Sequence, residues 1–84
     1  MVTYFITFRS VTFAQRGESA LRREGISCRI QRTPRWMEEQ GCGYSLSIRA
    51  AELNRSVAVL KEQQIPYRKV YLRKDGGNVE EVTL

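Results

Sequence analysis

Two cysteines, Cys28 and Cys42, are the side chains of this sequence that are best suited to chemistry. The chain contains no histidine, which excludes a Ser-His-Asp triad, a Cys-His dyad and a histidine-containing zinc site. Two thiols are too few for an all-cysteine zinc site or for an iron–sulfur cluster. We therefore expect no metal and no cofactor, and any chemistry must depend on a thiol, on carboxylates or on charge.

The two cysteines differ in their sequence surroundings. Cys28 precedes Ile30 on the apolar side of a short strand, which is typical of a small buried side chain. Cys42 stands between Gly41 and Gly43 in a loop of about a dozen residues, and long loops in compact domains often carry function. Glycine neighbours leave the sulfur accessible to a partner. We assign Cys28 to the core, while these residues alone leave a reactive Cys42 and a structural one equally open.

Other candidate residues are weaker. The paired carboxylates are Glu38-Glu39 and Glu80-Glu81. Because the two residues of each pair are adjacent in sequence, their side chains diverge and do not converge on one substrate atom. We therefore interpret both pairs as solvated acidic turns and not as the active site of a conventional hydrolase. In the loop, Trp36 and Met37 could cover Cys42 or contact a partner. Packing over the end of the core is the favoured interpretation of these two residues.

Length and composition indicate what kind of domain positions these residues. Eighty-four residues form one small domain, and 42% hydrophobic with 27% charged residues is ordinary globular composition. No stretch reaches the roughly 18 apolar residues of a membrane span, and no signal peptide is recognisable. We expect a cytoplasmic protein with reduced thiols, whose net charge of +5 mildly favours an anionic partner.

Apolar periodicity predicts the elements and their order. Alternation of apolar and polar residues predicts strands at residues 2–8, 27–31 and 44–49 and a fourth strand that begins at Pro66. Helical spacing of apolar residues predicts one helix over Val11–Glu24 and a second over Ala51–Gln64. Ser10 is the expected N-cap of the first helix, and Gly25 is its expected C-terminal stop. This order predicts an α+β, ferredoxin-like βαββαβ sandwich, with a four-stranded antiparallel sheet in the order 4-1-3-2 and two helices on one face. The domain would span residues 1–73. Residues 74–84 would form a turn and a tail, which is either an extra edge strand or free.

The predicted topology also locates Cys42. The third strand starts beside the end of the first strand, so Cys42 is expected next to Arg9 and Ser10, at the N-terminus of the first helix. Unpaired N–H groups, the helix dipole and the charge of Arg9 and Arg35 would all favour a thiolate there. A disulfide with Cys28 is disfavoured, because the two residues would lie roughly 10 Å or more apart along the strands.

Several segments resemble a known family. These are the run Tyr4–Ala14, Gly25-Ile26-Ser27-Cys28-Arg29, Thr33-Pro34-Arg35, Cys42-Gly43-Tyr44 and Ile65-Pro66-Tyr67. Together they resemble a small bacterial family of selenium/sulfur carrier-like proteins. The resemblance implies a ferredoxin-like domain in which Cys42 carries sulfur or selenium as a persulfide or selenyl-sulfide. It also implies a donor enzyme, an acceptor protein and a carrier rather than a conventional enzyme. The residues expected to support Cys42 are Arg9, Ser10, Arg35, Gly41 and Gly43.

The alternative is a binding module without thiol chemistry that uses the open face of the sheet. Aromatic and basic residues could bind single-stranded RNA there; they are Phe5, Tyr67, Tyr71, Arg29, Arg49 and Lys69. The central third strand lacks the aromatic pattern of an RNA-recognition motif, because Ser45, Ser47 and Arg49 face outward. Packing of this face against a partner protein or a second copy, as a homodimer, is therefore favoured over nucleic acid.

Overall fold

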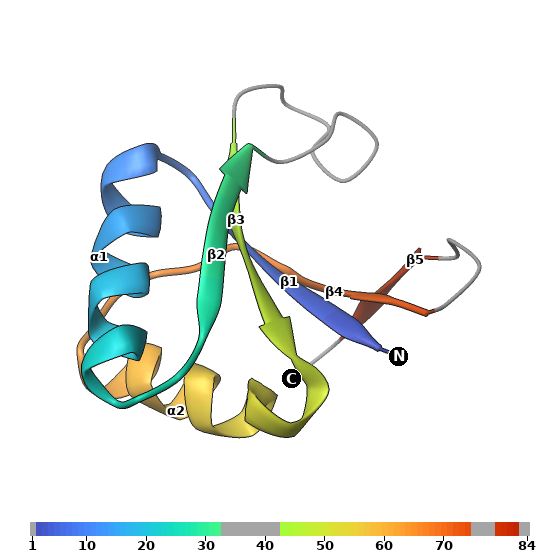
Figure 1. Ribbon diagram of the computed structural model, residues 1–84. Helices are drawn as coiled ribbons and strands as arrows, with labels where there is room; N and C mark the ends of the chain where they lie inside the picture. The colour runs from blue at the N-terminus through green and yellow to red at the C-terminus, as the bar shows by residue number, and fades with distance from the viewer. Residues whose placement is uncertain (1, 33–42, 75–78, 83–84) are drawn as a thin grey trace.

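The structure is a computed structural model that describes residues 2–32, 43–74 and 79–82. Its elements are β1 (Thr3–Phe8), α1 (Val11–Arg23), β2 (Cys28–Arg32), β3 (Tyr44–Arg49), the short 3-10 helix η1 (Ala50–Glu52), α2 (Leu53–Glu62), β4 (Val70–Arg73) and β5 (Val79–Val82). Figure 1 shows the two α-helices together on one side of a twisted sheet. Neither of these helices is long and apolar enough to cross a membrane.

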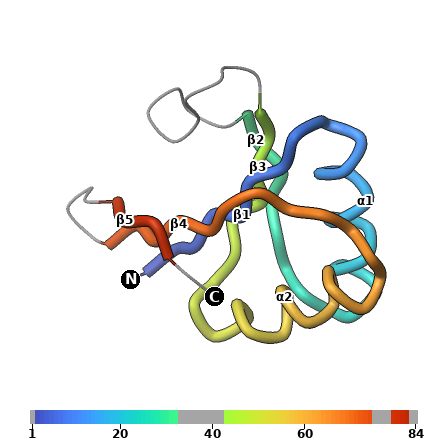
Figure 2. The backbone as a smooth tube through the Cα atoms, turned by 180° about the vertical axis from the view of Figure 1, so that it is seen from behind, coloured from blue at the N-terminus to red at the C-terminus, as the bar shows by residue number. Residues whose placement is uncertain are grey.

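The sheet has five strands in the order β2-β3-β1-β4-β5, and every neighbouring pair is antiparallel. The first four strands follow the predicted order 4-1-3-2. The predicted count of four strands is wrong, because β5 adds to the edge of β4 in the register Val70↔Val82 and Arg73↔Val79; Figure 2 shows this edge from behind. Of the two alternatives for the tail, residues 79–82 form the extra edge strand; two glutamates between two valines make too short a pattern to decide between them.

The connection into β4 also differs from the prediction, because the strand begins at Val70 and not at Pro66. Residues 66–69 instead run alongside the end of β1. There the N–H of Arg68 donates to the carbonyl of Thr7 at 2.8 Å, and the N–H of Thr7 donates to the carbonyl of Lys69 at 2.8 Å. The backbone of this connection is therefore fixed beside β1.

Both ends of α1 form as predicted. The Oγ of Ser10 accepts a hydrogen bond from the N–H of Phe13 at 3.3 Å, which satisfies one of the unpaired donors at the helix start. At the other end, Gly25 adopts a φ of 77°, and the N–H of Ile26 donates to the carbonyl of Leu21 at 2.9 Å. This left-handed C-terminal motif is the reason that glycine suits this position.

Gly17, in the middle of α1, is required by packing. A Cβ atom there would lie 3.1 Å from Cζ of Phe8, and 3.3 Å from a methyl group of Leu46 and from one of Leu60. Glycine lowers helix propensity by about 1 kcal/mol relative to alanine. Here it lets α1 approach β1, β3 and α2 closely over the main core, which also contains Ile6, Leu21, Ile26, Ile48 and Val70.

The second face of the sheet is less open than predicted. Phe5 is only 4% exposed, and Thr7 and Ser45 are also buried. The hydroxyl of Thr7 donates to the carbonyl of Lys69 at 3.2 Å and accepts from its N–H at 3.0 Å. The guanidinium of Arg73 lies 5.7 Å from the centre of the Phe5 ring. These contacts close the middle of a face that the sequence pattern alone predicts to be exposed.

Candidate functional site

Three of the predicted site residues meet at one end of the sheet. Phe8 pairs with Tyr44 in the β1–β3 register, and Arg9 directly follows Phe8 while Gly43 directly precedes Tyr44. Ser10 follows as the N-cap of α1. The Phe8↔Tyr44 pair confirms the prediction that the start of β3 lies beside the end of β1. The other predicted site residues, Arg35, Gly41 and Cys42, lie outside the described residues, as do Trp36 and Met37.

The electrostatics of this end favour an anion. The first turn of α1 contains no acidic residue, so no carboxylate of that turn offsets the partial positive charge at the helix start. The neighbouring Arg9 is exposed at the end of β1 and adds a full positive charge. A thiol held beside this end of the helix would ionise more readily than a free cysteine.

Cys28 lies elsewhere and in different surroundings. It begins β2 and pairs with Ile48, near the opposite end of β3 from Gly43. It carries a free thiol and packs, partly buried, against the core. Five residues of strand separate Ile48 from Gly43, or about 16 Å, which is consistent with the prediction that no disulfide joins the two cysteines.

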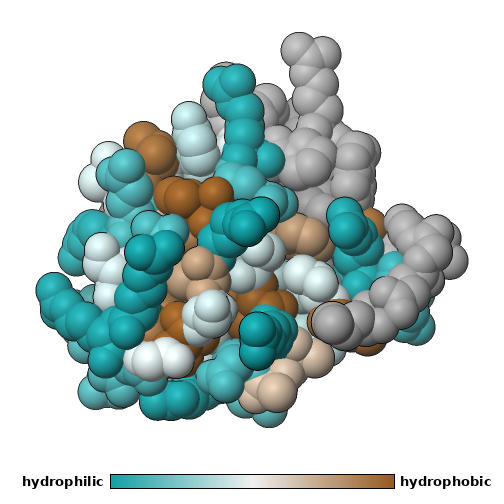
Figure 3. Space-filling view, in the orientation of Figure 1, coloured by the Kyte–Doolittle hydropathy of each residue, from teal (hydrophilic) through white to brown (hydrophobic). Residues whose placement is uncertain are grey.

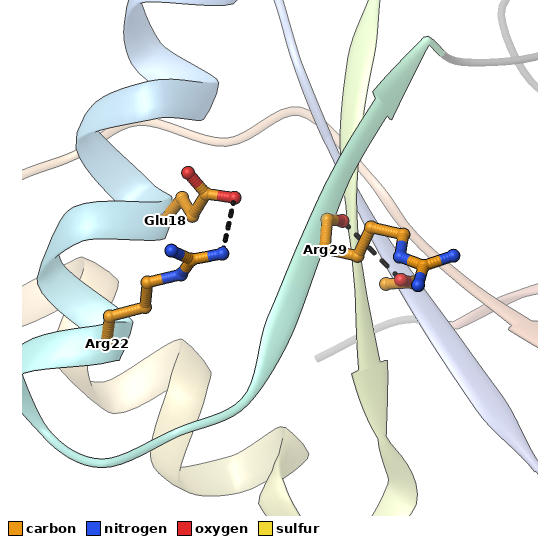
Figure 4. A network of polar contacts seen from close by, with 4 residues as sticks. Glu18, Arg22 and Arg29 are labelled. Carbon is orange, nitrogen blue, oxygen red and sulfur yellow. Dashed lines mark hydrogen bonds and ion pairs between the residues drawn. The ribbon is translucent and has the colours of Figure 1, made fainter.

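The pKa of the Cys28 thiol is raised above its ordinary value. Burial is the largest cause, and the negative charge of Glu18 adds to it, while the charge and hydrogen bond of Arg22 lower the pKa in part. Figure 4 shows Glu18 and Arg22 projecting from α1, joined by an ion pair of 3.5 Å. Cys28 is consequently a protonated, weakly nucleophilic thiol near neutral pH.

The contact between this pair and Cys28 is a feature that the sequence does not show. Spacing of four residues predicts that Glu18 and Arg22 form a helical ion pair, and the structure confirms it. Only the packing of α1 beside β2 brings the pair to Cys28. Arg29, the next residue in β2, projects to the other side of the strand (Figure 4), where its carbonyl accepts a hydrogen bond from Ser47 Oγ at 3.4 Å.

The aromatic set predicted for RNA stacking does not come together. Phe5 is buried, and Tyr67 lies before β4 and packs against the helix-side core. Of the three aromatic residues, Tyr71 alone remains partly exposed on this face, where it pairs with Phe5 in the β1–β4 register. Base stacking needs exposed rings, so this face does not support that alternative.

The described parts of the chain thus make an α+β domain that holds one thiol of raised pKa and a cationic helix start beside Gly43. Residues 3–72 match the model of the family described as "Putative Se/S carrier protein-like". The match spans most of the 84 residues, and the chain therefore belongs to this selenium/sulfur carrier-like family, as the resemblance predicts. Comparisons with curated proteins and with solved structures gave no match.

Proposed function

We propose that the chain carries sulfur or selenium on the thiol of Cys42, as a persulfide or selenyl-sulfide, from a donor enzyme to an acceptor protein. The observation that carries this proposal is the Phe8↔Tyr44 pair, which brings the start of β3, two residues after Cys42, to the end of β1 that leads through Arg9 to the N-cap Ser10. Membership of the carrier-like family supports it.

Carriage of a chalcogen atom needs a thiolate that is both exposed and ionised. Cys28 meets neither condition well, because it packs against the core and its pKa is raised by burial. Cys42 follows a glycine and precedes one in the sequence, and Tyr44, two residues later, pairs with Phe8 near the start of α1. We therefore assign the carrier role to Cys42 and a packing role to Cys28.

The proposed step is a thiol exchange without net oxidation. The thiolate of Cys42 attacks the terminal sulfur of a donor persulfide. A new S–S bond forms to Cys42 while the donor S–S bond breaks, and the donor cysteine leaves as a thiolate. An acceptor nucleophile then attacks the same terminal sulfur and releases the Cys42 thiolate. For selenium, the terminal atom of a donor selenyl-sulfide follows the same two exchanges.

The test is transfer of one sulfur atom, measured by intact mass after incubation with a cysteine desulfurase and free cysteine. We expect the wild-type chain and Cys28→Ser to gain a sulfur atom that a reductant removes. Cys42→Ser should gain none. Equal uptake by Cys42→Ser and wild type would overturn the proposal, and the Cys28→Ser variant controls for loading of any accessible thiol.

A further inference from the structure

A groove lies beside the cationic end of α1. It is lined by residues from the end of β1, from the first turn of α1 and from the connection into β4: Arg9, Phe13, Pro66, Tyr67, Arg68 and Lys69. Because Arg9 directly follows Phe8, which pairs with Tyr44 at the start of β3, the groove adjoins the end of the sheet at which β3 begins.

The backbone of this connection is held in place. Arg68 and Lys69 are anchored to Thr7 by the backbone hydrogen bonds described above, whereas both residues are exposed. Phe13 and Tyr67 are partly buried and pack against the core, so they present ring surface on a fixed base. The groove therefore combines apolar walls with a cationic rim.

No carboxylate is among the described residues that line the groove. One ion pair joins the groove to β5, where Glu81 Oε1 lies 3.4 Å from Lys69 Nζ and both side chains are about half exposed. Exposed pairs of this kind contribute about 0–1 kcal/mol, so another carboxylate can replace Glu81 at little cost. Arg9 and Arg68 are the other exposed cations of the lining.

An exposed apolar side chain lies close by. Among the large apolar residues that the structure describes, Val11 is the one that is exposed, at 37%, and it is the first residue of α1, two positions after Arg9. In Figure 3, which shows the side seen in Figure 1, hydrophilic side chains surround small separate apolar areas. A single exposed valine is ordinary, but beside this groove it extends the mixed apolar and cationic surface.

We propose that this groove docks an acidic segment of the protein that exchanges sulfur with Cys42, with an apolar side chain of that segment seated between Phe13 and Tyr67. The proposal rests on the proposed function. Carboxylates complement Arg9 and Arg68, and such complementarity speeds encounter and fixes orientation. Because the groove shares Arg9 with the end of the sheet at Gly43, a segment bound there would bring its own protein to the loop that contains Cys42.

A peptide partner fits better than a nucleic acid. Proteins that bind a phosphate backbone neutralise many phosphates along a stripe, often about 6–10 of them. Here three cations surround a short groove, and the predicted stacking ring Phe5 is buried. The apolar walls have no role in backbone neutralisation, whereas they suit one side chain of a peptide.

The test uses a fluorescein-labelled peptide of eight residues, rich in Asp and Glu with one central Leu, in a binding titration at low salt. To separate docking from thiol chemistry, all proteins carry Cys42→Ser. We expect binding to weaken about tenfold or more in Arg9→Glu/Arg68→Glu, which inverts two rim charges. Replacing the central Leu of the peptide by Ser should also weaken binding.

The matched control is Arg16→Glu/Arg23→Glu, which makes the same change of net charge on two exposed residues of α1 outside this groove. Thermal unfolding confirms that both variants are folded. Equal weakening in the two variants, or tighter binding of a single-stranded oligonucleotide than of the peptide at the same salt concentration, would overturn the proposal. If the peptide binds specifically but the wild-type chain gains no sulfur in the desulfurase test, the proposed function is refuted and the docking proposal stands.

Discussion

The two halves of α1 create opposite environments for a thiol. At its start, Ser10 caps the helix, Arg9 is exposed and the first turn contains no carboxylate. Nearer its end, the charges of Glu18 and Arg22 act on Cys28, and burial raises the pKa of that thiol. One helix therefore has a partly buried thiol of raised pKa near its end and a cationic N-terminus at its start, because charge and burial differ along its length.

The largest expected effect comes from disturbing the contact that holds both halves of α1 against the sheet. Gly17→Leu should destabilise the protein by about 3 kcal/mol, because the new side chain has no space between Phe8, Leu46 and Leu60. Denaturant unfolding followed by circular dichroism measures this change. An unfolding midpoint equal to that of wild type would contradict the close approach.

Gly17→Ala is the matched control for that variant. Its Cβ would meet three side-chain tips at 3.1–3.3 Å, so a shift of a few tenths of an ångström would accommodate it. A gain of about 1 kcal/mol in helix propensity opposes this cost. We expect a net change much smaller than that of Gly17→Leu.

The next effect is a difference in reactivity between the two thiols. At pH 7 and low salt, alkylation by iodoacetamide should be about tenfold faster or more at Cys42, measured in Cys28→Ser, than at Cys28, measured in Cys42→Ser. The reason is the larger thiolate fraction expected at Cys42. Equal rates for the two single-cysteine variants, with both folded, would remove the contrast between the two environments.

Loss of the helix cap should have a smaller effect. Ser10→Ala leaves the N–H of Phe13 without its side-chain acceptor and should cost about 1 kcal/mol in the free energy of unfolding. Ser19→Ala, at an exposed position within α1, is the control and should be neutral or slightly stabilising. If the two variants unfold at the same denaturant concentration, the cap contributes nothing.

The smallest effect concerns the charge of Glu18. In the Cys42→Ser background, Glu18→Gln should lower the pKa of Cys28, and Arg22→Gln should raise it. Thiolate absorbance across a pH titration measures both. An unchanged pKa in the two variants would show that burial alone raises it.

The same shift has a consequence for stability. Because the folded-state pKa of Cys28 lies above its unfolded value, the neutral thiol contributes stability that is fully present below the unfolded pKa. This contribution is lost as the pH rises through the folded pKa. Cys28→Ser should therefore lose less stability than wild type over that alkaline window. If the free energy of unfolding of the wild type falls no more steeply with pH than that of Cys28→Ser, the raised pKa of Cys28 is contradicted.

Much of the fold follows from local sequence patterns. Alternating residues in β1 and β3, the capping hydroxyl of Ser10 and the glycine at position 25 act over a few residues, and each appears in the structure as predicted. The predicted start of the fourth strand at Pro66 is wrong. Residues 66–69 run beside the end of β1, but β4 begins only at Val70.

The sequence by itself determined the helices, the first four strands, their order and the place of Cys28 in a strand against the core, because periodicity and capping depend on neighbouring residues. Only the tertiary structure decided that β5 extends the sheet, that Phe5 and Thr7 are buried, and that Glu18 reaches Cys28. Burial and Coulomb interactions depend on which distant segments meet. The groove between α1 and the connection into β4 arises in the same way, since its walls are brought together by packing across more than fifty residues of sequence.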